Sequence, residues 1–467
     1  MAAGGLKALD DALRERGLES LLAPAEAAGA PAVRRLRADL ATLDWAVYDR
    51  QRSLLDGESA VDLEGIAAPE LLPTSRSAAP GHEDARSTGW DALRAGQVAV
   101  VTVAGGQASR LGFDGPKGAF PIGPVSGASL FQGFAGQLAR LRARAAARIP
   151  WIVQTGPGNH AETVAYFRRR NFFGLRGDIH FVCQGTLPAL ASDGTPLLAA
   201  PDALFRNPDG HGGIWQALVG DSLLARLADA GTTTFFYFQV DNPLVPIADP
   251  VFLGYHLQAQ AGMSAKVVEK SDPAEKVGLV VRRADGRHAC LEYSDLSETM
   301  QGERADDDGG LRWRAGNIAM HAFSADFAAR MADTPLPLHA ARKQVLALDG
   351  GPVPVTREGV KFETFVFDAL PLAERSVIQL ADRAEEFAPV KNRSGVDSIA
   401  TARAALSARN LRWLERAGLP VAEKLDDRAS ILEFAPGLCL DPGDLADRRG
   451  ELEFVGGRLL RPRRRPG

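Results

Sequence analysis

The stretch QVAVVTVAGGQASRLG, residues 97–112, decides the fold. Its short run of apolar, β-branched residues predicts a buried strand, which two glycines end. The following stretch SLFQGFAGQLARLRARAAA (129–147) has apolar residues at helical spacing, and PWIVQTG (150–156) predicts another strand. A strand, a helix and a strand in this order predict a βαβ unit.

The same alternation continues as far as residue 262. Helices are predicted over 160–170, 220–231 and 249–262, and strands over 178–184 and 232–242. We therefore predict an α/β fold with a mixed, mostly parallel, Rossmann-like sheet flanked by helices. Short apolar runs at 264–270, 277–283 and 288–294 predict an antiparallel extension of that sheet.

The chain of 467 residues is too long for one ordinary core, so we predict three consecutive parts. Residues 1–90 form a helical N-terminal extension whose end, 73–89, is rich in Pro, Ser and Gly and predicts a linker or exposed loop. Residues 91–385 form the central domain, which contains the predicted sheet. Residues 386–467 form a C-terminal helix and a small β domain with a basic tail, RPRRRPG, which we interpret as a solvated end.

Composition narrows the functional class. Hydrophobic residues make up 45% and charged residues 24%, and the formal net charge is −4, which gives no broad attraction to nucleic acid or membrane. The N-terminal stretch lacks the apolar run of a secretory signal, so we expect a cytoplasmic protein. The three cysteines have no CxxC spacing, so we expect buried thiols, and the histidines have no zinc-binding spacing.

The glycine-rich loop after the first strand predicts a phosphate-binding site. Gly105 and Gly106 let the backbone approach a phosphate closely, and Arg110 and Lys117 add mobile positive charge. The spacing fits neither the dinucleotide-binding GxGxxG motif nor a Walker A loop. A tight structural turn is the alternative interpretation.

Asp241 is the candidate metal ligand. It comes just beyond the apolar strand TTTFFYFQV, and ligands of open α/β sheets bind at the carboxyl ends of the strands. A carboxylate there can hold Mg²⁺ against phosphate oxygens. The alternative is a cap for the helix that begins near residue 249.

Other polar residues are candidates with a weaker signal when each is taken alone. Gln184 follows a strand and offers both a donor and an acceptor to a base edge. The turn PDGHGGIW (208–215) is a second glycine-rich segment, or a plain loop. Glu292 and Asn317 interrupt apolar strands, where they bind either sugar hydroxyls or the backbone, whereas Lys361 and Lys391 suit either a moving phosphate or the solvent.

Together, these segments resemble the eukaryote-type UDP-sugar pyrophosphorylases, most closely the UDP-N-acetylglucosamine pyrophosphorylases. The loop VAGGQASRLG with PKGAFPIG is similar to the family's nucleotide loop. Six further segments resemble the family in the same order over about residues 100–405: FFYFQVDNPLVPIADPVFLGYH, SAKVVEKSDPAEKVGLVV, LEYSDLS, AGNIAMHAF, VKFETFVFDALP and EEFAPVKN.

The resemblance implies a uridylyltransferase that forms a UDP-sugar and pyrophosphate from UTP and a sugar 1-phosphate with Mg²⁺. It implies that Val103, Ala104, Gly105, Gly106, Gln184, Gly210, His211 and Asp241 bind the nucleotide, with Asp241 also on the metal. Catalytic charge is then expected from Arg110, Lys117 and Lys391, and contacts to the sugar phosphate from Gly210, Lys270, Glu292, Asn317 and Lys361.

Two departures from the family pattern bear on these expectations. The chain has GHGG at 210–213, where N-acetylglucosamine enzymes resemble GNGG and UDP-glucose or broad-specificity enzymes resemble GHGD. We expect N-acetylglucosamine 1-phosphate as the substrate, with a UDP-glucose or broad UDP-sugar enzyme as the alternative and a non-catalytic nucleotide-sugar-binding protein as a further one. Ala108 stands where the family usually has Gly, and it fits only if its φ is negative.

Overall fold

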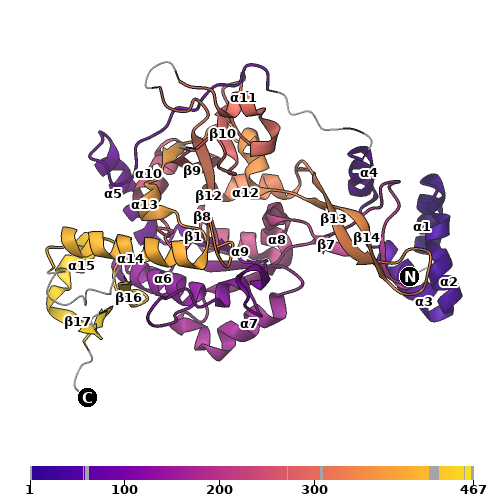
Figure 1. Cartoon of the computed structure of the whole chain (residues 1–467), viewed down its shortest axis with the longest axis horizontal. Helices are drawn as coiled ribbons and strands as arrows, with labels where there is room; N and C mark the ends of the chain where they lie inside the picture. The colour runs from indigo at the N-terminus through magenta and orange to yellow at the C-terminus, as the bar shows by residue number, and fades with distance from the viewer. Residues whose placement is uncertain are drawn as a thin grey trace. The chain divides into compact units, whose positions relative to one another are not determined.

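The computed structural model of the protein describes residues 3–55, 57, 63–270, 272–305, 309–419, 431–456 and 458–463. The chain forms two compact units, a larger one of residues 63–183, 214–334 and 367–467 and a smaller one of residues 1–62, 184–213 and 335–366. Both are discontinuous in sequence and therefore differ from the predicted segments 1–90, 91–385 and 386–467. Figure 1 shows their helices and strands.

A nine-stranded sheet forms the centre of the larger unit. Its main path runs β11-β10-β12-β8-β1-β2-β3, and β9 pairs with both β12 and β15. The pairs β8–β1, β1–β2, β2–β3 and β9–β15 are parallel, whereas β12 runs antiparallel to β8 and β9. The strands are β1 (Val98–Val103), β2 (Trp151–Thr155), β3 (Ile179–Cys183), β8 (Thr234–Gln239), β9 (Met263–Glu269), β10 (Leu279–Arg282), β11 (His288–Leu291), β12 (Ala315–Ser324) and β15 (Ile378–Leu380).

The mostly parallel sheet and its antiparallel extension confirm the predicted fold class. The central strands are buried along nearly their whole length, which is why they are apolar runs without alternation. Helices flank the sheet in Figure 1. They include α6 (Leu130–Ala145), α7 (His160–Arg169), α8 (Ile214–Val219), α9 (Leu223–Asp229), α10 (Pro250–Gln258), α12 (Ala325–Ala332) and α14 (Ile399–Arg416). In the described part of the chain no helix is long and apolar enough to cross a membrane.

The predicted linker at 73–89 is wrong over its second half, because α5 spans His82–Arg94. This helix packs on α10 at very short range. A Cβ on Gly89 would stand 1.9 Å from the Pro250 carbonyl oxygen, and one on Gly254 would stand 1.7 Å from the Ala85 carbonyl oxygen. Gly89, which contributed to the prediction of a loop, therefore permits a close helix–helix contact together with Gly254.

The C-terminal part of the larger unit contains the predicted helix α14 and a small sheet. Strands β16 (Glu433–Phe434), β17 (Leu452–Val455) and β18 (Leu459–Pro462) form this sheet, and α15 (Pro442–Asp447) packs on α14. The last four residues of the basic tail lie outside the described residues. Of the cysteines predicted to be buried, Cys439 is buried, Cys290 is half-buried and Cys183 is exposed, so that prediction is wrong for Cys183.

The smaller unit combines the N-terminal helices with two later stretches of chain. Apolar residues from all three stretches share one core, including Leu36, Leu190 and Phe362, so the predicted helical extension is only part of this unit. The helices are α1 (Ala3–Glu15), α2 (Ala23–Ala28), α3 (Ala30–Leu40) and α4 (Trp45–Ser53). The strands are β4 (Thr186–Pro188), β5 (Leu198–Ala200), β6 (Ala203–Leu204), β7 (Arg206–Pro208), β13 (His339–Ala347) and β14 (Val355–Glu363).

Candidate active site

The glycine-rich loop begins where β1 ends at Val103 and is held by its neighbours in the larger unit. The Ala104 N–H donates to the Gln154 carbonyl (2.7 Å), and the Asn159 side-chain amide donates to the carbonyls of Ala104 (2.7 Å) and Gly106 (3.1 Å). A Cβ on Gly106 would meet nothing within 4 Å, so the loop is open there to an incoming group. Sequence reasoning missed Asn159, whose place before α7 indicates only a helix cap.

Ala108 satisfies the condition set by the sequence. Its φ is −94°, within the range that alanine adopts without strain, and it is 1% exposed. Its methyl group belongs to the apolar core beneath the loop, together with Leu111 and Phe120. The alanine therefore forces no left-handed backbone and fills a place in the core.

Lys117 and Asp241 form the central charged pair of the larger unit. The Lys117 Nζ lies 3.2 Å from the Asp241 Oδ2, and the two side chains are only 13% and 14% exposed. The alternative interpretation of Asp241 as a helix cap is wrong, because Asp249 caps α10 by accepting from the Val251 N–H (3.0 Å). The pair joins the two segments that the sequence singled out for phosphate and metal.

One further basic segment, which contains Lys391 and Arg393, lies next to the glycine-rich loop. The Asp241 carbonyl accepts from the Val390 N–H (2.9 Å), which brings the neighbouring Lys391 to the end of β8. Lys391 pairs with Asp397 (3.2 Å) and is 41% exposed. The Arg393 side chain lies over Gly112, within 3.7 Å of where a Cβ would stand, and sequence reasoning missed it.

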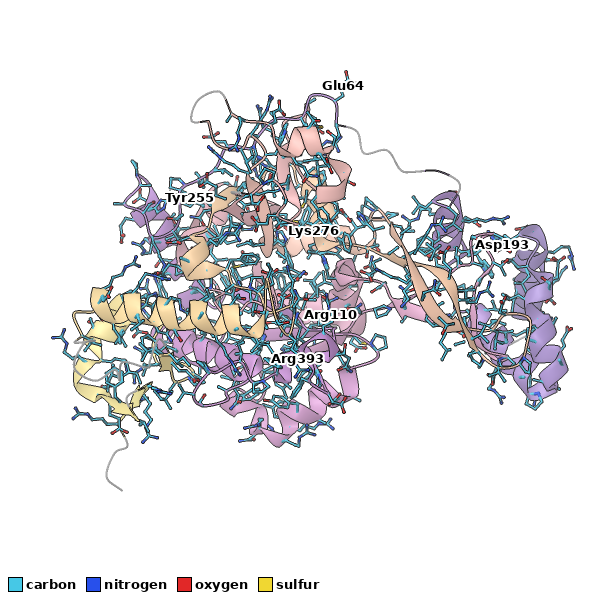
Figure 2. All side chains as sticks on the ribbon, viewed as in Figure 1. Glu64, Arg110, Asp193, Tyr255, Lys276 and Arg393 are labelled. Atoms are coloured by element: carbon cyan, nitrogen blue, oxygen red, sulfur yellow. The ribbon has the colours of Figure 1, made fainter. Side chains whose placement is uncertain are left out.

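Arg110 is exposed on the short 3-10 turn Ser109–Leu111. Figure 2 labels it together with Arg393 in the same region of the larger unit. The predicted catalytic cations therefore gather around one loop, where the Lys117–Asp241 pair is mostly buried and Arg110 is exposed to solvent.

Lys270 is a buried cation at the end of β9. It is 1% exposed, and its Nζ has no hydrogen-bond partner among the described residues. Burial lowers the pKa of this lysine, against the opposing effect of Glu275 and Asp272. An unpaired buried ammonium costs folding free energy, which an anionic ligand would recover.

Asn317 and Glu292 lie on neighbouring parts of the antiparallel extension. Asn317 stands at an irregularity of β12, where its amide donates to the Cys290 sulfur (3.4 Å) and its Oδ1 accepts from the Ala319 N–H (3.0 Å). The Glu292 carboxylate caps the short turn Tyr293–Asp295. Bulges often re-aim side chains beside functional sites, and the local bonds give both groups a fixed position.

The remaining predicted residues belong to the smaller unit. Gln184 is 7% exposed. Gly210 has a φ of +88° and lies close to the backbone of Thr364, a combination that glycine accommodates most easily. The His211 ring stacks on Phe365 at 5.1 Å, and the Lys361 Nζ lies 5.4 Å from the centre of the Phe205 ring.

Asp209 and His211 have shifted acidities in this unit. Burial raises the pKa of Asp209 to about 6, and burial lowers the pKa of His211 to about 4. The His211 Nδ1 accepts from the Val366 N–H (3.0 Å). At neutral pH this ring is therefore neutral, and its single proton is on Nε2. Asp209 was not singled out from the sequence, because an aspartate before glycine is ordinary in a turn.

Comparison with known proteins gives one consistent result. Residues 69–416 match the family described as UTP--glucose-1-phosphate uridylyltransferase. UDP-N-acetylglucosamine diphosphorylase 2 of Arabidopsis thaliana is 36% identical, covering 76% of this chain and 73% of the relative. UDP-N-acetylglucosamine pyrophosphorylase of Saccharomyces cerevisiae is also 36% identical, covering 83% and 85%. The solved structure of the Trypanosoma brucei uridine diphosphate N-acetylglucosamine pyrophosphorylase matches with a TM-score of 0.80 at 26% identity, covering 96% of this chain and 95% of that one.

Proposed function

Since this chain belongs to the UTP–glucose-1-phosphate uridylyltransferase family, we propose that it forms a UDP-sugar and pyrophosphate from UTP and a sugar 1-phosphate. We propose N-acetylglucosamine 1-phosphate as the sugar phosphate. The observation that carries the proposal is the Lys117–Asp241 pair at the mouth of the glycine-rich loop. Cation, carboxylate and open glycine backbone together are what a nucleoside triphosphate with its metal requires.

The reaction needs no protein nucleophile, because the sugar phosphate is already ionised. One of its oxygens attacks the α-phosphorus of UTP, a new phosphorus–oxygen bond forms, and the bond to the β-phosphate breaks to release pyrophosphate. The protein therefore contributes alignment and charge neutralisation. Lys117 would exchange Asp241 for a phosphate oxygen, and Arg110 and Lys391 would add charge around the same loop.

The residues present fit a magnesium ion. No group of three or more His, Cys, Asp or Glu side chains is gathered to bind a metal in the described ranges, so the protein would supply the Asp241 carboxylate. Magnesium commonly binds through one or two carboxylates and completes its shell with waters and substrate phosphates. When bound, it would neutralise charge on the reacting phosphates.

Base and sugar recognition are assigned by the type of hydrogen bond each side chain can make. The Gln184 amide can donate to and accept from one uracil edge. The neutral His211 ring can donate only from Nε2, which suits an oxygen acceptor of the nucleotide or sugar. Glu292, Asn317 and Lys270 would bind the sugar phosphate, with Lys270 finding there the anion that it lacks.

Two relatives whose names specify N-acetylglucosamine support the choice of sugar. His211 in the GHGG turn keeps a UDP-glucose or broad-specificity enzyme as the second candidate, because the family's glucose enzymes resemble GHGD there. The Lys361 ammonium lies over the Phe205 ring. We therefore expect Lys361 to affect the choice of sugar only indirectly, through the packing of the smaller unit. Specificity depends on which buried polar groups the wrong sugar leaves unpaired.

The deciding experiment measures pyrophosphate release from UTP and Mg²⁺ with the 1-phosphates of N-acetylglucosamine, glucose and galactose. We expect kcat/KM to be highest for N-acetylglucosamine 1-phosphate. A higher value for glucose 1-phosphate would replace the sugar assignment. Tight binding of a UDP-sugar without pyrophosphate release from any substrate would make the chain a binding protein. Omitting Mg²⁺ tests the metal in the same assay.

A further inference from the structure

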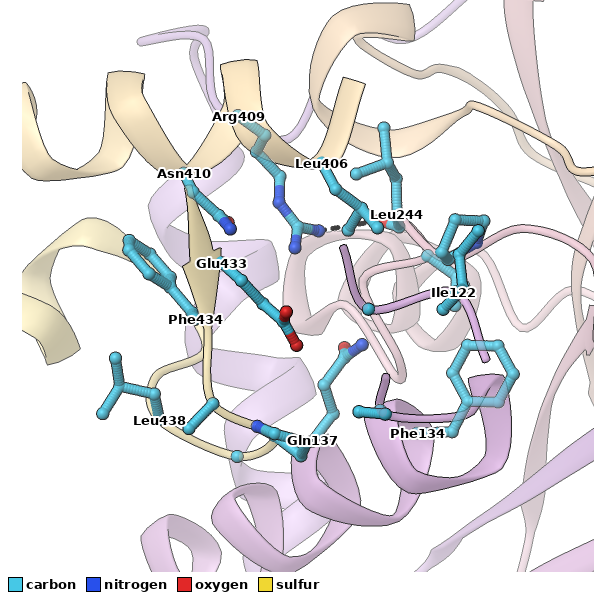
Figure 3. Close-up of a pocket in the computed structure, with 18 of the residues that line it drawn as sticks. Ile122, Phe134, Gln137, Leu244, Leu406, Arg409, Asn410, Glu433, Phe434 and Leu438 are labelled. Atoms are coloured by element: carbon cyan, nitrogen blue, oxygen red, sulfur yellow. Dashed lines mark hydrogen bonds between the residues drawn. The ribbon is translucent and has the colours of Figure 1, made fainter. Parts of the chain in front are cut away.

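A small, mostly apolar cavity lies in the larger unit between α6, α14 and β16 (Figure 3). Its volume is about 110 Å³. An engineered closed cavity of roughly 150 Å³ binds benzene; this one is smaller but partly open to solvent, so a single small ring with a polar group at the open side is the largest ligand to consider. The apolar lining includes Ile122, Phe134, Leu244, Leu406, Phe434 and Leu438.

Arg409 of α14 enters this apolar lining with an incomplete set of partners. Its Nε is buried and has no hydrogen-bond partner in the described part of the chain, and its Nη1 reaches the Leu244 carbonyl only at 3.5 Å. The guanidinium lies 5.0 Å from the centre of the Trp413 ring. Burial lowers the pKa of Arg409 to about 10, so the side chain still carries its charge at neutral pH.

Asn410, the next residue, adds a second incomplete group. It is 3% exposed, its Nδ2 donates to the Leu432 carbonyl (3.1 Å), and its Oδ1 is buried without a partner in the described ranges. Buried polar atoms are rarely left unpaired, and each one calls for a partner. Figure 3 shows Arg409 and Asn410 pointing from the helix toward the cavity.

The carboxylates that line the cavity already have partners. Glu385 accepts from Arg412 (2.6 Å) and from the Trp413 indole (2.7 Å), and Arg76 lies 3.6 Å from it. Arginines therefore outnumber this one glutamate, and Arg409 lacks a carboxylate of its own.

The other carboxylate that lines the cavity is Glu433. It accepts from the N–H groups of Val125 (2.7 Å) and Ser126 (2.8 Å) and from the Ser126 hydroxyl (2.5 Å). The donors around Glu433 are neutral, so it keeps its negative charge, but neither carboxylate hydrogen-bonds to Arg409. Arg76, Arg409 and Arg412 together outnumber Glu385 and Glu433 around the cavity, which leaves an excess of positive charge at its polar end.

We propose that this cavity is a second binding site, which takes a small organic anion with a carboxylate or phosphate group and one apolar ring. The anion pairs with the Arg409 guanidinium, whose planar donors match both groups. The ring packs against Phe134 and Leu406. A buried charge without a counter-ion costs folding free energy, which the ligand's anion offsets.

Occupation of this site acts on both segments that carry the Lys117–Asp241 pair. Arg409 contacts the Leu244 carbonyl, which follows Asp241 in the chain. Arg403 of α14 donates to the carbonyls of Pro121 (2.8 Å) and Ile122 (3.1 Å), which follow Lys117. Ile122 and Leu244 both line the cavity, so we infer that an anion bound there shifts the two segments and changes the rate of the proposed reaction.

The binding test uses three probes on the full chain: benzoate, phenyl phosphate and the neutral benzamide. Isothermal titration measures affinity without any dependence on the proposed function. We expect benzoate or phenyl phosphate to bind at least tenfold more tightly than benzamide, and the stronger of the two identifies the anionic group. Equal affinity for benzoate and benzamide, or no binding of either anion, would overturn the site.

Two variants locate the binding. Arg409→Gln removes the charge, and Gly133→Leu fills the cavity, because Gly133 lines it and a Cβ there meets nothing within 4 Å. Gly450→Leu is the matched control at an exposed glycine that also has free space. We expect at least tenfold weaker anion binding in the first two and unchanged binding in the control. Binding retained by both Arg409→Gln and Gly133→Leu would place the anion elsewhere and overturn the proposal.

Pyrophosphate release then tests the coupling alone. Saturating benzoate or phenyl phosphate should change kcat at least twofold in the wild-type chain and leave the Gly133→Leu variant unchanged. An anion that binds at the cavity with no effect on kcat would overturn the coupling and leave the site standing. A chain that binds the anion and releases no pyrophosphate at all would overturn the proposed function only.

Discussion

Two clusters of lysine and carboxylate in the larger unit contain the same kinds of side chain but differ in their exposure to solvent. Lys117 and Asp241 meet through one contact of 3.2 Å, and both remain partly exposed. Lys266 is fully buried and contacts Asp249 and Glu386, each at 2.5 Å. We call the first the open pair, because its side chains can exchange one another for a ligand. We call the second the closed cluster, because Lys266 is fully buried between its two carboxylates.

The closed cluster has a complete set of bonds around Asp249. Besides Lys266, Asp249 accepts from the Ser75 hydroxyl (2.5 Å) and from the Val251 N–H (3.0 Å). The cluster also supports the open pair, because the Asn242 amide donates to the Glu386 carbonyl (2.7 Å) beside Asp241. We infer that the fully buried cluster holds the backbone in position, whereas the partly exposed pair can exchange its partner for a substrate, even on neighbouring stretches of one chain.

The largest expected effect is on stability, from Lys266→Met. This change leaves two buried carboxylates without their cation, which should lower the free energy of unfolding by about 3–5 kcal/mol. Turnover per folded molecule should stay within a few-fold of wild type. Urea unfolding at pH 7, together with pyrophosphate release at low temperature, measures both. A stability loss below about 1 kcal/mol would mean that the closed cluster is not structural.

Lys117→Ala should give the opposite pattern. Loss of a charge that stabilises the reacting phosphates should lower kcat by roughly 10²-fold or more, while the unfolding free energy changes by less than about 1 kcal/mol. Lys7→Ala is the matched control, because Lys7 is exposed on α1 and belongs to the smaller unit. Near wild-type turnover in the Lys117 variant would contradict the assignment of the open pair to catalysis.

The third prediction separates the two carboxylates of the closed cluster. Burial alone would raise the pKa of Asp249, but Lys266 and Ser75 outweigh it and hold that pKa below its ordinary value. Burial raises the pKa of Glu386, and Lys266 offsets this only in part. Ionised Asp249 therefore stabilises the fold above about pH 4, and this stabilisation is lost as the pH falls through its lowered pKa. The pH dependence of the contribution of Glu386 to stability has the opposite sign, because this contribution disappears as the pH rises through its raised pKa.

At pH 7, Asp249→Asn should therefore cost more stability than Glu386→Gln, by roughly 1–2 kcal/mol. The gap should narrow as unfolding is repeated at pH values down to about 4. Urea unfolding of both variants across this range measures it. Equal losses of unfolding free energy at pH 7, or a difference between the two variants that grows at lower pH, would contradict the pKa directions assigned to Asp249 and Glu386.

These clusters also show what the sequence could predict. The apolar strand runs predicted the sheet, and the glycines and lysine of residues 103–117 predicted the loop to which we assign phosphate binding, because both signals are local. Lys266 stands in the apolar run SAKVV and was a visible signal, but its partners Asp249 and Glu386 come from distant segments. Only the tertiary fold brings them together.

The prediction failed where local composition and tertiary packing disagree. Residues 82–89 of α5 fell in the predicted linker because the stretch 73–89 is rich in Pro, Ser and Gly, whereas the close approach to α10 requires Gly89. The hairpin β13–β14 was not predicted, since most of β13 is exposed on both faces and has no alternation of polar and apolar residues. Asn159 and Arg393 entered the site through contacts with Gly106 and Gly112 that the sequence does not record.

The smallest effect is expected from Ala108→Gly, which tests whether the open pair depends on the exact packing of its loop. The methyl group is buried in the core and the backbone φ is already negative, so glycine relieves no strain. Losing a buried methyl group and adding backbone freedom should lower the unfolding free energy by about 1 kcal/mol, with kcat and the KM for UTP within twofold of wild type. Thermal unfolding and pyrophosphate release measure these quantities. A several-fold fall in the KM for UTP would instead mean that the methyl group obstructs the phosphates, and that the loop around Lys117 is as tightly constrained as the closed cluster.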